Sequence, residues 1–142
     1  MEVIMIMADN SAYRQRKRVF KNSCRIYINE KSHLLALEKK YPFLKNEPAT
    51  EDSAILHVGI FSDLNEAQRI IYSYKHIKEN TEYVDSVFTD IESKCGSDAK
   101  SILWKLYVEG STQEIVAVEY GVGKRTIQRW VKQWLDQEFK PV

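Results

Sequence analysis

Apolar residues recur every three or four positions along much of this chain, the spacing that places them on one face of an α-helix. The clearest run lies in residues 63–95, where the apolar members are Leu64, Ala67, Ile71, Tyr74, Ile77, Val84, Phe88, Ile91 and Cys95. Asp63 and Glu66 have the spacing of a capping box at its start. We predict an amphipathic helix, either continuous or divided near residues 79–81, where the stripe lacks an apolar member. Its stripe is expected to form core packing or a seam between helices.

Residues 9–44 have a less regular helical pattern and are predicted to form a helix with a break near residues 29–31. Residues 9–11 (Asp-Asn-Ser) are good N-cap residues, which places the start of the helix near Ala12. Pro42 should end it, because the residue before a proline resists the helical conformation.

Residues 46–62 are predicted to be a linker, since their first half is polar and rich in turn-forming residues. The apolar run Ile55–Phe61 fits a short strand or a packed loop, and residues 24–28 also have a local strand pattern. An isolated strand has no partner here, and five glycines and three prolines leave room for long helices. We therefore predict an all-α fold.

The C-terminal residues 97–142 are predicted to begin with a short helix. Gly96 ends the preceding helix, Ser97 and Asp98 start this one, and Gly110 closes it. Its apolar face is formed by Ile102, Leu103, Leu106 and Tyr107. Trp104 lies off that stripe and is expected to pack on the helix before it.

Two more helices follow from Ser111, joined by a tight turn. Ser111 and Glu114 have capping-box spacing, Gly121 suits a turn with positive φ, and Lys124–Gln137 forms the second helix. The residues expected to face the core are Ile115, Val116, Ala117, Tyr120, Val122, Ile127, Trp130, Val131 and Trp134. This is the layout of a helix-turn-helix, which inserts its second helix into the DNA major groove.

The opposite face of the second helix is basic and carries side chains that read DNA. Arginine neutralises phosphates and pairs with guanine, glutamine pairs with adenine, and threonine contacts a phosphate or a thymine methyl. Backbone amides at the start of the first helix suit a phosphate. The predicted DNA-binding residues are Thr112, Gln113, Lys124, Arg125, Thr126, Gln128, Arg129 and Lys132. The alternative interpretation is a solvated face, or one that binds acidic proteins.

The net charge of +1 hides an uneven distribution of charge along the chain. Residues 1–45 carry ten basic and four acidic side chains, whereas residues 46–97 carry four and ten. Because phosphates respond to the local field, such patches are compatible with nucleic-acid binding. The densest basic cluster is Arg14, Arg16, Lys17 and Arg18. We interpret it as either a solvated helix face or an auxiliary phosphate-binding surface.

The sequence does not favour an enzyme or a metalloprotein. Cys24 and Cys95 are far apart, which favours a reduced, cytoplasmic setting over a disulfide framework. The three histidines lack zinc-ligand spacing, and the acids are not arranged as a nuclease or transposase metal site would need. The apolar start is too short for a signal peptide or a membrane span, and Met5 or Met7 is an alternative start. We expect no catalytic residue, metal, cofactor or membrane contact.

Glu114–Ala117, Tyr120–Val122 and Thr126-Ile127 resemble the helix-turn-helix of sigma-factor region four and its relatives. Arg129–Lys132 is also similar to transposase-type segments of this kind. With its basic N-terminal helix, linker, long helix and sigma-like C-terminal motif, the whole layout resembles phage transcriptional regulators of the RinA and ArpU type. Gly123 departs from the pattern, because many of these motifs have a Ser or Thr N-cap there.

The resemblance implies a non-enzymatic, sequence-specific DNA-binding regulator of phage or mobile-element late genes. Its partner would be double-stranded DNA. A second partner, RNA polymerase or another copy of the chain in a homodimer, is also expected, because one small motif buries little surface on DNA. Two alternatives stay open: a DNA-targeting subunit of a transposition or DNA-packaging machine (small-terminase-like), and a protein-interaction module. The regions on this interpretation are residues 1–45, 46–62, 63–95 and 97–142.

Overall fold

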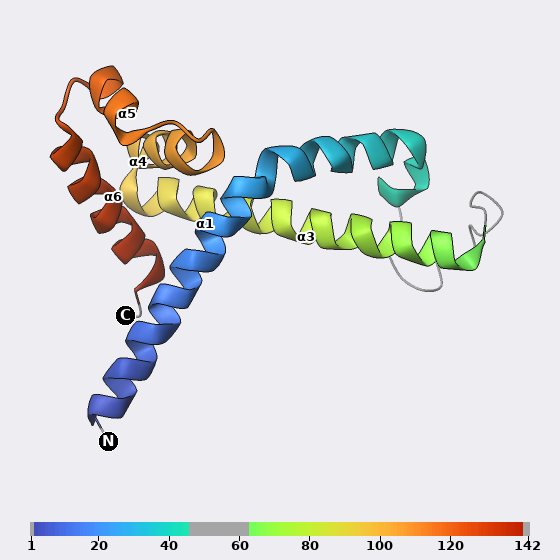
Figure 1. The fold of residues 1–142 in the computed structure, drawn as a ribbon, viewed down its shortest axis with the longest axis horizontal. Coiled ribbons are helices and arrows are strands. Elements are labelled where there is room, and N and C mark those ends of the chain that lie inside the picture. The colour runs from blue at the N-terminus through green and yellow to red at the C-terminus, as the bar shows by residue number, and fades with distance from the viewer. Residues whose placement is uncertain (1, 46–62, 141–142) are drawn as a thin grey trace. The chain divides into compact units, whose positions relative to one another are not determined.

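The computed structural model describes residues 2–45 and 63–140, with side chains from residue 11 onward. The described residues are all-α, as predicted, and none of them forms a strand (Figure 1). The elements are α1 (Glu2–Lys40), the 3-10 helix η1 (Pro42–Lys45), α3 (Leu64–Cys95), α4 (Ser97–Leu103), the π-helix η3 (Trp104–Val108), α5 (Gln113–Tyr120) and α6 (Lys124–Phe139). The predicted linker 46–62, with its apolar run Ile55–Phe61, lies outside the described residues.

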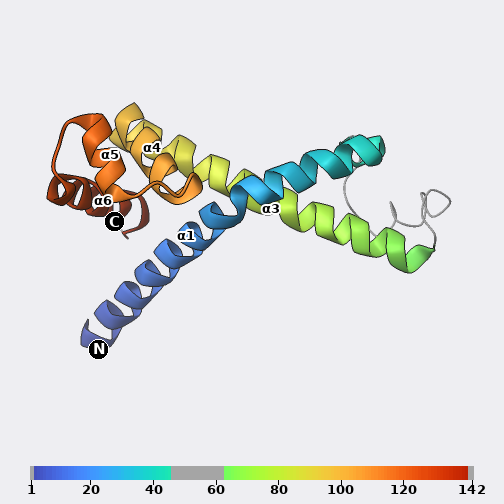
Figure 2. The same cartoon turned by 45° about the horizontal axis from the view of Figure 1, so that its top comes forward.

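The chain divides into two compact units, and both long helices contribute to each. One unit combines Met1–Ile26 with Val84–Val142, and the other is Tyr27–Tyr83. In the first unit, α4, α5 and α6 gather at the C-terminal end of α3 (Figures 1 and 2). The candidate interface therefore belongs to a unit built from both ends of the sequence.

Helix α1 begins at Glu2, so the predicted start near Ala12 is wrong, and so is the predicted break at residues 29–31. The polar residues 9–11 are tolerated inside a helix, because their propensity cost is only a few tenths of a kcal/mol each, roughly. At the predicted break, Glu30 accepts a 2.8 Å hydrogen bond from the Asn80 side chain of α3, a contact that the local pattern does not contain. The helix ends at Lys40, shortly before Pro42, as predicted.

Helix α3 runs without interruption from Leu64 to Cys95. Its start is capped as predicted, since the Glu66 amide donates to Asp63 Oδ1 at 2.7 Å. At the weak point of the apolar stripe, Thr81 is only 1% exposed. Its hydroxyl donates to the carbonyl of Lys78 at 3.0 Å, so the buried polar group is satisfied within the helix itself. Thr81 therefore fills a core position, and the helix continues.

The unit Tyr27–Tyr83 has a core contributed by α1, η1 and α3. The buried residues of this core are Leu34, Tyr41, Leu44, Ala67, Ile71 and Tyr74. The Tyr74 hydroxyl donates to Glu38 at 3.0 Å. Burial, with Glu38 nearby, raises the pKa of Tyr74 to about 12. The tyrosine therefore stays protonated and keeps its donor role.

The other unit has an aromatic core centred on Phe20 of α1, which is fully buried. Its ring centroid lies 5.4 Å from Phe88 of α3, 5.2 Å from Phe139 of α6 and 6.2 Å from Tyr107 of η3. Trp104 packs edge-on against Phe88 at 5.0 Å, which confirms the predicted contact with α3. Tilted and edge-to-face pairs of this kind add about 0.5–1.5 kcal/mol each beyond the area they bury. One α1 residue thus joins three other elements.

The π-helix η3 replaces the last turn of the helix predicted to end at Gly110. The Glu109 amide reaches five residues back to the carbonyl of Trp104, at 3.1 Å, and Gly110 has a φ of 76°. Within residues 2–45 and 63–140, no helix is both long and apolar enough to span a bilayer.

Candidate nucleic-acid interface

Helix α5 begins one residue later than the capping-box spacing predicts. Thr112 is the N-cap, and its hydroxyl accepts a 3.2 Å hydrogen bond from the Ile115 amide. The predicted cap, Ser111, instead donates its amide to the carbonyl of Lys105 in η3, at 2.9 Å. The structure therefore corrects the role of Glu114, whose carboxylate turns toward α6.

The turn between α5 and α6 has the backbone predicted for it. Gly121 adopts a left-handed conformation, with φ 67° and ψ 32°. The Val122 amide closes the turn by donating to the carbonyl of Ala117, at 3.0 Å. Gly123 is the N-cap of α6 and provides no side-chain cap, as its lack of a side chain predicts. Helix α6 therefore lacks a side-chain cap of the kind that Thr112 gives to α5.

Helix α6 has one buried face, formed by every fourth residue. Its buried members are Ile127, Val131, Leu135 and Phe139. Trp130 and Trp134, predicted on this side, are only half-buried, and their ring centroids lie 5.9 Å apart. On α5 the prediction is wrong for Ile115, which is 53% exposed, because only Val116 and Ala117 of that short helix reach the core.

The predicted DNA-binding residues of α6 lie mostly on its exposed side. Arg125, Arg129 and Lys132 are spaced by four and three residues, so they share one exposed helix face. Thr126 is half-buried. Arg129 and Lys132 also line a depression of about 480 Å³ with Asp136, which brings an acid to the edge of this face.

Two contacts connect the first turn of α5 with the start of α6. Gln128 donates from its amide nitrogen to Gln113 Oε1 at 3.1 Å, so two predicted DNA-binding residues meet. Lys124 Nζ lies 2.8 Å from Glu114 Oε1, and this hydrogen bond holds the pKa of Glu114 below its usual range. Sequence reasoning missed this acid, because it lies ten residues away on another helix.

Two members of the basic cluster on α1 have intramolecular partners. Arg16 donates from Nε and Nη2 to the carbonyl of Phe139, at 3.2 and 2.6 Å, and so caps the C-terminal end of α6. Lys17 Nζ lies 4.1 Å from the ring centroid of Tyr13. Arg14 and Arg18 are exposed. The auxiliary DNA-binding role stays a prediction, and Arg16 has a structural contact instead.

The C-terminal half of α6 is also fixed to the end of α3. Lys94 Nζ lies 3.3 Å from Glu138 Oε2, and the Cys95 thiol donates to Gln137 Oε1 at 2.9 Å. The Glu138 side chain is only 6% exposed, and burial raises the pKa of its carboxyl. Together with the Arg16 cap, these contacts hold α6 by its last turns.

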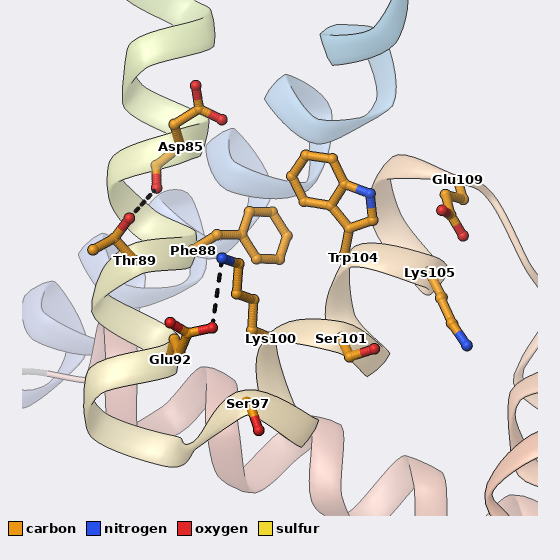
Figure 3. A pocket seen from close by; sticks show the side chains of 10 residues that line it. All are labelled: Asp85, Phe88, Thr89, Glu92, Ser97, Lys100, Ser101, Trp104, Lys105 and Glu109. Atoms are coloured by element: carbon orange, nitrogen blue, oxygen red, sulfur yellow. Dashed lines mark hydrogen bonds and ion pairs between the residues drawn. The ribbon is translucent and has the colours of Figure 1, made fainter.

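A pocket of about 670 Å³ lies beside α3, α4 and η3 in the same unit (Figure 3). Phe88 and Trp104 form its aromatic wall, and the Lys100 side chain extends to Glu92, with Nζ and Oε2 3.5 Å apart (Figure 3). Lys105, at its edge, pairs with Glu119 of α5 at 2.7 Å. The pocket therefore has mixed charge, in contrast to the basic face of α6, and its lining residues all lie within residues 85–109.

Among the side chains that the structure describes, no three potential metal ligands converge. Comparison with protein-family models, with curated proteins and with solved structures found no significant match.

Proposed function

We propose that this protein is a sequence-specific, DNA-binding transcriptional regulator that reads the major groove with α6. The observation that carries the proposal is the division of α6 into two faces. One face consists of buried residues at every fourth position. The other face is exposed and carries Arg125, Gln128, Arg129 and Lys132. A helix about 12 Å across with its side chains fits the major groove, which is also about 12 Å wide.

The connection to α5 supports the same proposal. A three-residue turn that begins with the left-handed Gly121 joins the two helices. The Gln113–Gln128 and Glu114–Lys124 contacts hold the first turn of α5 against the start of α6. On a helix-turn-helix interpretation, α5 would lie across the DNA backbone while α6 enters the groove. The resemblance to RinA and ArpU regulators supports late-gene control in a phage or mobile element as the biological setting.

Such a small reading surface needs a second contact for specific affinity. A single module buries about 600–1,000 Å² on DNA, whereas dimers and larger assemblies bury more. We therefore propose that a second copy of the chain, or RNA polymerase, provides the further contact.

The double substitution R125A/R129A tests the assignment. Target duplexes are first selected from a random pool with the wild-type protein, and affinities are then measured by fluorescence anisotropy at fixed salt. Two base-reading arginines should contribute about 1–3 kcal/mol each, so the variant should bind its target at least about 30-fold more weakly and with relaxed specificity.

The matched control is R69A/K75A, which removes the same charge from exposed positions on α3. It should keep target affinity within a few-fold of the wild-type protein. Retention of full affinity by R125A/R129A would show that α6 is not the reading helix.

A further inference from the structure

A carboxylate of α5 lies against the first basic residue of α6. Glu114 Oε1 and Lys124 Nζ are 2.8 Å apart, and the two side chains are 62% and 52% exposed. The neighbouring bond from Gln128 to Gln113, 3.1 Å long, holds the same turn of α5 against α6. Two contacts from consecutive residues therefore fix the carboxylate at the basic face.

The same helix carries a second Glu–Lys pair in a different place. Glu119 Oε2 lies 2.7 Å from Nζ of Lys105, which belongs to η3. Glu119 is five positions after Glu114, so the two side chains point roughly 140° apart around α5. The two pairs have similar geometry, and only Glu114 faces α6.

Exposed ion pairs contribute little to folding stability, so the consequence of Glu114 lies in its charge. Sequence-independent binding to DNA is driven by cations that neutralise phosphates and release counterions. A lysine already neutralised by a carboxylate adds little to that count, because a phosphate must compete with the carboxylate for it. Lys124 thus contributes to the basic composition of α6 without adding a full phosphate contact.

We propose that Glu114 is a specificity-determining residue, whose carboxylate withholds Lys124 from the DNA backbone and lowers sequence-independent affinity. Discrimination then depends more heavily on Arg125, Gln128 and Arg129. This inference rests on the proposed function. It extends the interface to an acid that the predicted set of DNA-binding residues does not include.

The experiment measures binding of the full chain to a random-sequence duplex between about 50 and 200 mM KCl. Each phosphate contact adds about 0.9 to the slope of log K against log salt. E114Q should steepen that slope by about 0.9, so that its affinity falls about 3.5-fold more than that of wild type over this range. E119Q, the matched control, should leave the slope at its wild-type value.

Lys124→Gln shows whether the effect passes through Lys124. K124Q should lower the slope by about 0.9 in the E114Q background and by clearly less in the wild-type background. Equal losses in the two backgrounds would mean that Glu114 repels DNA directly, and would overturn the inference. A wild-type slope for E114Q would overturn it as well.

These outcomes separate the inference from the proposed function. If wild type binds duplex DNA and R125A/R129A weakens that binding, an unchanged E114Q slope overturns the inference alone. If wild type does not bind duplex DNA at about 50 mM salt, both fall. Thermal melting by circular dichroism checks that each variant is folded.

Discussion

Replacing Arg16 by methionine tests how the C-terminal end of α6 is held. The guanidinium donates from Nε and Nη2 to the carbonyl oxygen of Phe139, at 3.2 and 2.6 Å. Methionine keeps an unbranched side chain with similar helix propensity and removes both donors. The substitution therefore separates the two hydrogen bonds from the packing of the aliphatic part of the side chain.

Two effects determine the size of the expected loss. A hydrogen bond to a charged group contributes about 1.5–3 kcal/mol, and a cation at a helix C-terminus contributes about 0.3–1 kcal/mol. The Phe139 carbonyl is only part-buried, so water replaces some of the lost bonding. We expect R16M to lower the free energy of opening the last turn of α6 by about 1–2 kcal/mol.

Native-state amide hydrogen exchange measures this opening locally. The Lys140 amide is an informative probe, since it donates to the carbonyl of Asp136 at 3.0 Å in that turn. R16M should speed its exchange by about 5- to 30-fold, because 1.4 kcal/mol corresponds to a factor of about ten. The control R18M removes an exposed arginine from the same helix and should leave the rate unchanged.

Equal exchange rates in R16M and R18M would refute the reasoning. The end of α6 would then be held by the burial of Leu135 and Phe139 and by its contacts with α3, without a contribution from Arg16.

Two further predictions concern the turn and the buried carboxyl. Gly121→Ala should lower the free energy of unfolding, measured by chemical denaturation, by about 1–2 kcal/mol. An added Cβ meets no atom within 4 Å, so the loss comes from the backbone conformation, whose φ is 67°. A variant as stable as wild type would contradict this prediction. Burial raises the folded-state pKa of Glu138, so its contribution to stability is present at low pH and is lost as pH rises through that pKa. E138Q should remove this component of the pH dependence, which lies just above the ordinary glutamate pKa of about 4.3. Unfolding free energies with the same pH slope as wild type would contradict it.

Local signals predicted much of this fold. Asp63 starts α3, Gly96 separates α3 from α4, and Gly121 forms the left-handed turn, because caps and positive φ depend on adjacent residues. The all-α class followed from helical periodicity. The boundary of α1 is not predicted because cap-forming residues are also tolerated inside a helix. The π-helix η3 is not predicted because it differs from an α-helix only in hydrogen bonds that span five residues instead of four.

Contacts between distant segments could not be predicted from one sequence. Arg16 and Phe139 are 123 positions apart, and no local pattern pairs a cluster arginine with the end of the last helix. Glu114 was assigned to a cap at Ser111, whereas the register of α5 brings it to Lys124. Whether a basic side chain is exposed or paired depends on such contacts, which sequence spacing does not contain.

The unit that carries α6 is assembled from two separate segments of the sequence. This restricts which gene fragments can transfer the unit to another protein. Met1–Ile26 is synthesised before Val84–Val142, so Phe20 emerges from the ribosome before the aromatic rings that it packs against. A gene fragment encoding residues 97–142 alone would lack both Phe20 and Phe88. Recombination that exchanges only the C-terminal helices would therefore yield a domain without the centre of its core.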